Sequence, residues 1–132
     1  MELTRSYAFG KTVEMGYAET VARVREELAK EGFGVLTEID VTEKFREKLG
    51  RDFRDYIILG ACNPAMAWEA FQMELNIGTL LPCNVCVYTG NDGKTVVMAM
   101  DPVAALGIIG NAELTDVAAT VRQKMERVLA AL

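Results

Sequence analysis

The sequence contains no histidine among its 132 residues. Histidine is the side chain whose ordinary pKa lies closest to physiological pH, and it is the most common general base and metal ligand. Its absence excludes Ser–His and Cys–His nucleophilic catalysis, and it excludes metal sites built on imidazole. Only carboxylate, lysine, tyrosine and thiol chemistry remain available to this chain.

Basic residues are also few, with 14 Lys and Arg against 19 Asp and Glu and a formal net charge of −5. Nucleic-acid binding normally requires a basic face that neutralises phosphates. The densest basic segment, residues 43–55, contains nearly as many acidic residues and is typical of a solvated surface of mixed charge. We therefore expect no nucleic-acid partner.

Long apolar runs are missing as well. The N-terminal segment has no apolar core of the length that a signal peptide needs. The longest uncharged stretch, residues 75–91, contains Asn76, Thr79 and Pro82 and is a poor membrane span. We expect no membrane partner and a cytoplasmic location. Three cysteines, an odd number, then indicate free thiols in a reducing compartment.

With 51% hydrophobic residues and three prolines, residues 1–132 are predicted to form a single domain around one core. Residue alternation and short apolar runs predict strands over 5–13, 34–41, 56–61, 80–89 and 95–100. Helical spacing predicts helices that begin near Gly16, Thr42, Asn63 and Asn111, and Thr42 is expected to cap the second of them. This order predicts the α/β (α+β) class: a two-layer sandwich with a mixed or mainly antiparallel sheet of about five strands and helices mostly on one face.

Cys83 and Cys86 form a C-x-x-C pattern, which can indicate a redox or zinc site. In a strand, however, residues three apart point to opposite faces with Cα atoms about 10 Å apart, whereas a disulfide needs Cα atoms within about 7 Å. A zinc site would also need two more ligands. We therefore predict no metal and no cofactor, and we expect Cys86 to pack as a small apolar side chain.

Cys62 ends a predicted strand and directly precedes Asn63 and Pro64, which are favoured at the N-cap and first positions of a helix. The positive end of that helix would favour a thiolate. We therefore expect Cys62 to be the most nucleophilic of the three thiols, with a modestly lowered pKa that burial would oppose. The alternative is that Cys62 is a small residue that closes a tight strand-to-helix turn.

Whether Cys62 meets Cys83 depends on the topology. If the two strands are parallel, with helix 63–73 as the crossover, the thiols lie about 15 Å apart at opposite ends. If residues 74–82 carry the chain back, the thiols can share a site. Contact between two subunits could also bring them together.

The segments GACNP (residues 60–64) and LPCNV (residues 81–85) lie about twenty residues apart. They resemble the signature of the domain of unknown function 302 family (DUF302), and further similarity at residues 32–35, 39–41, 48–50 and 101–102 extends over nearly the whole chain. The resemblance implies a compact α/β fold, frequent homodimers and no established activity. In two departures, Cys86 stands where an aliphatic residue is usual, and Trp68 stands where some members carry histidine.

Two kinds of function follow. The first is a thiol-centred binding or sulfur-handling module with Cys62, Asn63, Cys83 and Asn84 as candidate site residues, and with a small soft ligand such as Cu(I) or a persulfide sulfur. The second is a non-catalytic homodimer in which both Cys–Asn motifs only form turns. Either way we expect a homodimer that uses the apolar residues 103–109 and 75–87, and no catalysed reaction is predicted.

Overall fold

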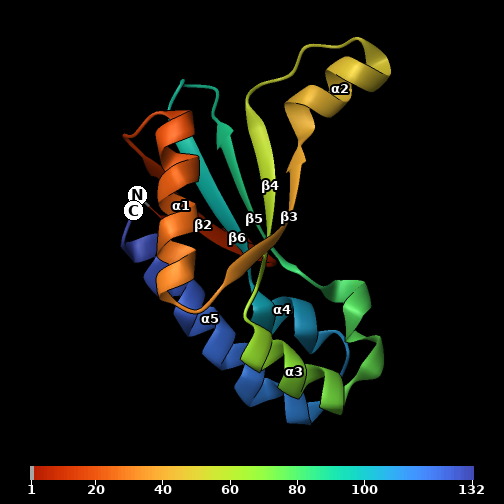
Figure 1. The fold of residues 1–132 in the computed structure, drawn as a ribbon. Coiled ribbons are helices and arrows are strands. Elements are labelled where there is room, and N and C mark those ends of the chain that lie inside the picture. Colours follow the sequence, from red (N-terminus) through yellow and green to blue (C-terminus); the bar gives the residue numbers. More distant parts are fainter. Residues whose placement is uncertain (1) are drawn as a thin grey trace.

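The computed structural model describes residues 2–132, and Figure 1 shows its layers. In chain order the elements are β1 (Glu2–Thr4), β2 (Ala8–Val13), α1 (Tyr17–Lys30), β3 (Gly34–Asp40), α2 (Val41–Leu49), β4 (Tyr56–Cys62), α3 (Pro64–Met73), the 3₁₀ helix η1 (Leu75–Leu80), β5 (Cys83–Thr89), β6 (Thr95–Met100), α4 (Pro102–Gly107), the 3₁₀ helix η2 (Ala112–Leu114) and α5 (Thr115–Ala130). The predicted α+β class and two-layer architecture are confirmed.

Residues 2–132 form one six-stranded sheet in the order β1-β2-β6-β5-β4-β3, and each neighbouring pair is antiparallel. The sheet therefore has one strand more than the sequence predicted. The segment predicted as a single strand over residues 5–13 instead turns at residues 5–7, where the Arg5 amide donates to the Ala8 carbonyl at 2.7 Å. This turn lets β1 pair back along β2.

The core lies between the sheet and helices α1 and α5 (Figure 1). Alternate side chains of the central strands point to these helices and are buried, namely Ile57, Leu59, Val85, Val87, Val97 and Ala99. From α5 the predicted stripe meets them, with Val117, Val121, Met125 and Val128 buried. Complete burial of one such aliphatic side chain contributes about 1.5–3 kcal/mol relative to exposure, so this layer supplies most of the driving force for folding.

Helix α2 stands away from the body of the molecule at one end of the sheet (Figure 1). Its N-cap is Asp40, whose side chain accepts a hydrogen bond from the Glu43 amide at 3.0 Å. The prediction that Thr42 caps this helix is wrong, because its hydroxyl donates to the Arg54 carbonyl and accepts from the Tyr56 amide. Gly50 ends the helix in the left-handed conformation (φ 63°), as its sequence position predicts.

The opposite end of the molecule is helical and contains α3, η1 and α4. The turn of η1 carries the chain back toward the sheet, so β5 begins at Cys83 rather than at residue 80. The apolar segment 103–109 falls mostly in α4, which Asp101 caps by accepting from the Val103 and Ala104 amides. Asp101 is buried and forms an ion pair with Arg122 of α5, which fixes α4 against the core.

Gly60, in the GACNP motif, lies where two side chains approach the backbone closely. A Cβ atom there would stand 2.0 Å from the Thr37 hydroxyl oxygen and 2.7 Å from Pro82 Cγ. Both distances are shorter than a van der Waals contact, so a residue with a side chain requires these neighbours to move. A methyl group at Gly34 on the adjacent edge strand would meet no atom within 4 Å.

We therefore predict that Gly60→Ala lowers the free energy of unfolding by about 1–3 kcal/mol, the usual cost of overpacking. Gly34→Ala is the matched control and should change stability by less than about 0.5 kcal/mol. Urea denaturation of both variants measures the difference. Equal stability of the two variants would contradict the close approach at Gly60.

Candidate functional site

A cavity of about 290 Å³ lies at the helical end of the molecule. Its floor is formed by the ends of β4 and β5, and its walls come from α3, η1, α4 and α5. The lining residues are apolar, except for the Asn63 amide and the thiols of Cys62 and Cys83. The GACNP and LPCNV motifs therefore meet at one place in the fold.

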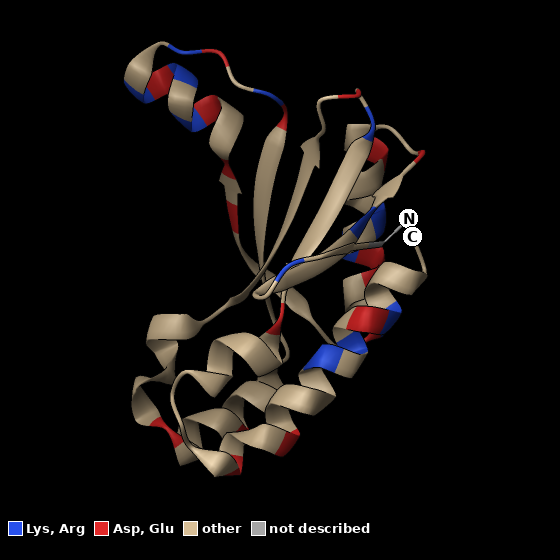
Figure 2. Cartoon of the chain, turned by 180° about the vertical axis from the view of Figure 1, so that it is seen from behind, with Lys and Arg blue, Asp and Glu red and all other residues tan. Residues whose placement is uncertain are grey.

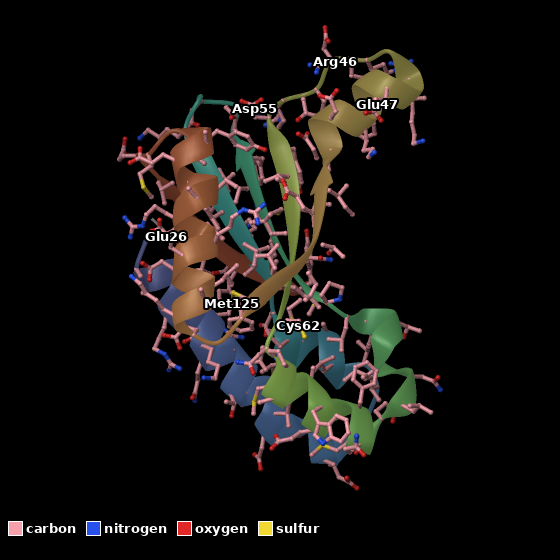
Figure 3. All side chains as sticks on the ribbon, viewed as in Figure 1. Glu26, Arg46, Glu47, Asp55, Cys62 and Met125 are labelled. Atoms are coloured by element: carbon pink, nitrogen blue, oxygen red, sulfur yellow. The ribbon has the colours of Figure 1, made fainter. Side chains whose placement is uncertain are left out.

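The pairing of β4 with β5 brings the two thiols together. The strands are antiparallel, and Ala61 is the direct partner of Cys83, so Cys62 is one residue from that pair. Of the alternatives that the sequence left open, the structure has the one in which residues 74–82 carry the chain back. Figure 3 shows Cys62 where β4 meets the helical end.

Cys62 is half-buried at the end of β4, directly before the N-cap of α3. The sequence predicted that the helix end would lower its pKa. The direction is the opposite, because burial raises the pKa of the Cys62 thiol. Desolvation disfavours the charged form more than the helix dipole stabilises it. At neutral pH the side chain is a thiol rather than a thiolate.

Cys83 is 7% exposed and belongs to the core cluster. Burial, and to a smaller extent negative charge on Cys62, raise the pKa of Cys83 to about 11. Both residues line the cavity, and at neutral pH both side chains are neutral thiols.

Asn63 lies at the cavity, but both ends of its amide are used internally. Its Oδ1 accepts from the Met66 amide at 3.3 Å, which caps α3 as predicted. Its Nδ2 donates to the Glu31 carbonyl at 3.2 Å, which ties the end of α1 to the start of α3. Asn63 therefore builds the site rather than presenting a free polar group to a ligand.

Asn84 and Cys86 do not join this site. Asn84 pairs with Gly60 and is exposed. Asn84 and Cys86 both line a groove on the opposite face of the sheet. Cys83 and Cys86 therefore point to opposite faces of β5, as strand geometry predicts for residues three apart. All three cysteines are free. Within residues 2–132, no group of three His, Cys, Asp or Glu side chains is placed to hold a metal ion.

Most of the cavity wall was not recognised from the sequence. Helix α3 provides Met66, Ala67, Ala70 and Phe71, and η1 provides Ile77 and Gly78. The available signal was the small residues on α3, because small side chains leave space. Trp68 is 70% exposed and does not line the cavity.

The six-stranded antiparallel sheet with helices on one face places the chain among two-layer α+β domains. The model of the family described as "Domain of unknown function DUF302" matches residues 9–132, and the chain belongs to this family. A crystal structure of an uncharacterised conserved DUF302 protein from Bacillus stearothermophilus is similar, with 35% sequence identity and a TM-score of 0.88. The alignment covers 94% of this chain and 96% of that chain. No curated protein matches.

None of the helices within residues 2–132 is long and apolar enough to cross a membrane.

The raised pKa of Cys83 predicts a loss of stability at alkaline pH. An ordinary cysteine titrates near 9.0 and Cys83 near 11, so the unfolded chain releases this proton first. Its contribution to stability is complete below about pH 9 and is lost as the pH rises toward 11. We predict that, between about pH 8 and pH 10.5, the free energy of unfolding falls by about 2 kcal/mol more in the wild type than in Cys83→Ala.

Denaturant titrations at the two pH values measure this difference. Cys86→Ala is the control, because Cys86 is less buried than Cys83 and should reproduce most of the alkaline loss of the wild type. Parallel pH dependence of Cys83→Ala and the wild type would contradict burial of the Cys83 thiol.

Proposed function

We propose that this protein is a thiol-centred binding module that holds a small molecule in the cavity at the helical end, in contact with Cys62 and Cys83. The observation that carries the proposal is that Cys62 and Cys83 both line one apolar cavity of about 290 Å³. Ligand sites are typically concave and mostly apolar, with a few polar or reactive groups that orient the ligand. The cavity has this composition.

The state of the thiols favours a molecule over a metal ion or a persulfide. Binding of Cu(I) and sulfur transfer both require a thiolate. Burial raises the pKa of both cysteines, so protons compete with such ligands. A neutral thiol is a weak hydrogen-bond donor with a soft, polarisable sulfur atom, and it suits contact with an uncharged ligand.

We predict that N-ethylmaleimide, a small uncharged reagent, labels Cys62 before Cys83, because Cys62 is half-buried and Cys83 is 7% exposed. The adduct on Cys62 should then fill the cavity and slow labelling of Cys83 at least about tenfold relative to the Cys62→Ser variant. Peptide mapping by mass spectrometry gives the rate for each cysteine.

Cys86 provides an internal control, because it lies on the other face of β5 and its rate should be the same in both proteins. If the Cys62 adduct leaves the Cys83 rate unchanged, or if neither thiol reacts before the protein unfolds, the two thiols do not share an accessible site. The structural alternative would then be the better account.

A homodimer, which is expected with either function, is supported by the face of the sheet opposite α1 and α5, here called the open face. Its half-buried side chains include Tyr56, Ile58, Tyr88, Met98 and Met100. Antiparallel sheets that face water normally carry polar residues there, but β4, β5 and β6 contain no charged residue. Figure 2 shows these central strands in tan, with the red and blue positions on the helices, loops and outer strands around them.

The apolar surface continues from the open face onto α2. Tyr56 stacks on Tyr88 with ring centroids 5.1 Å apart, Phe53 lies 6.1 Å from Tyr56, and Phe45 of α2 lies 5.2 Å from Phe53. Among its residues α2 buries none. An amphipathic helix whose apolar side is not packed gains little stability from the rest of its own chain. Helix α2 and the open face together therefore form one surface suited to a partner.

We propose a second copy of this chain as the occupant of the open face. In a twofold interface the same surface patch of each copy makes the contact. A patch with charges of one sign is therefore repelled by the same patch on the second copy. A chain with a net charge of −5 can self-associate best through a face without charges. Arg5 lies at the edge of the open-face groove, where solvent can still reach it.

We predict that Met98→Glu weakens the dimer at least about 100-fold, because it buries two unpaired carboxylates. Tyr7→Glu should act in the same direction; Tyr7 lines the groove and is 65% exposed, so this change cannot disturb the core. Ile108→Glu is the control, since Ile108 is 76% exposed and belongs to the segment 103–109. Sedimentation equilibrium measures all three variants.

A wild-type monomer at micromolar concentration would overturn the homodimer. Dissociation by Ile108→Glu but not by the two open-face variants would instead place the interface on residues 103–109, one of the two segments that the sequence favoured.

A further inference from the structure

We propose that the ligand of the cavity is an uncharged, largely apolar organic molecule of about ten to twelve non-hydrogen atoms. The inference rests on the proposed function, and it adds the chemical class of the ligand. Three observations carry it: the chemistry of the wall, the volume, and the residues at the mouth.

The wall provides no side chain that would pair with an ionised group. No lining residue among those that the structure describes is Lys, Arg, Asp or Glu. The only side-chain amide, that of Asn63, already bonds to Met66 and Glu31. Moving a charged group from water to such surroundings without a partner costs several kcal/mol. Carboxylates, phosphates and ammonium groups are therefore selected against.

The volume sets an upper size. An apolar cavity of about 150 Å³ holds benzene, which has six carbon atoms. A cavity of about 290 Å³ has room for about twice that number. A two-ring aromatic molecule or a medium-length alkyl chain has this size.

Entry takes place where lining residues reach solvent. Leu36 is 67% exposed and Phe71 is 38% exposed, and both line the cavity, so they mark its mouth. Gly78 lies beside Phe71, where a Cβ atom would be 3.7 Å from the ring. The mouth is therefore apolar as well, and the small glycine leaves the Phe71 ring room to shift when a ligand enters.

The test compares decanol with decanoate, which have the same ten-carbon chain but differ in charge. Isothermal titration is carried out below the solubility limit of decanol and below the critical micelle concentration of decanoate. It should show one decanol bound per chain and at least about tenfold weaker binding of decanoate. Ala67→Phe fills the cavity and should lower the decanol affinity at least about tenfold. Ala65→Phe is the matched control, because Ala65 is exposed on the same helix and does not line the cavity.

Equal affinity for decanol and decanoate would overturn the inferred ligand class. Absence of decanol binding, or equal loss in Ala65→Phe and Ala67→Phe, would also overturn it. If Ala67→Phe does not fold, Gly78→Leu narrows the mouth and replaces it.

The proposed function fails separately. Bound decanol should slow the reaction of Cys62 with N-ethylmaleimide and leave that of Cys86 unchanged. Charge-selective binding of decanol without this protection would mean that the cavity selects apolar ligands but that the thiols take no part.

Discussion

The antiparallel pairing of β4 with β5 is the constraint on which the candidate site depends. It sets Ala61 opposite Cys83 and so brings the GACNP and LPCNV motifs to one end of the sheet. The chain between them must leave the sheet and return within twenty residues, which α3 and η1 accomplish. This connection consists of two short helices, α3 and η1, which cover the ends of the strands without filling the space above them.

The cavity follows from which residues face that space. Ala67 and Ala70 of α3 and Gly78 of η1 line it, where larger side chains would close a normally packed core. Asn63 holds the arrangement in place, because its amide joins the start of α3 to the end of α1. The small residues of α3 and η1 therefore leave the space open, and Asn63 keeps α3 in its position above it.

The elements that the sequence predicted well are those specified by local chemistry. Alternation and short apolar runs identified β3 to β6 within a few residues, and Asn63–Pro64 identified the start of α3. The errors arise where distant residues decide. The alternating pattern of residues 5–13 runs through a turn, so β1 was missed, and Thr42 bonds across to Arg54 and Tyr56 instead of capping α2. The direction of the Cys62 pKa depends on burial by residues far along the chain, which local sequence does not contain.

The size of the cavity argues that it is kept for binding. Its mouth opens to solvent at Leu36 and Phe71, so the unoccupied cavity leaves apolar lining side chains without packing partners, which is unfavourable. Larger residues at Ala67 or Gly78 would fill the space and remove this cost. Water is a poor occupant, because the lining offers it few free polar partners. An apolar ligand that enters past Leu36 and Phe71 restores the missing contacts, and it does so while both cysteines remain protonated, which is the state that burial imposes on them.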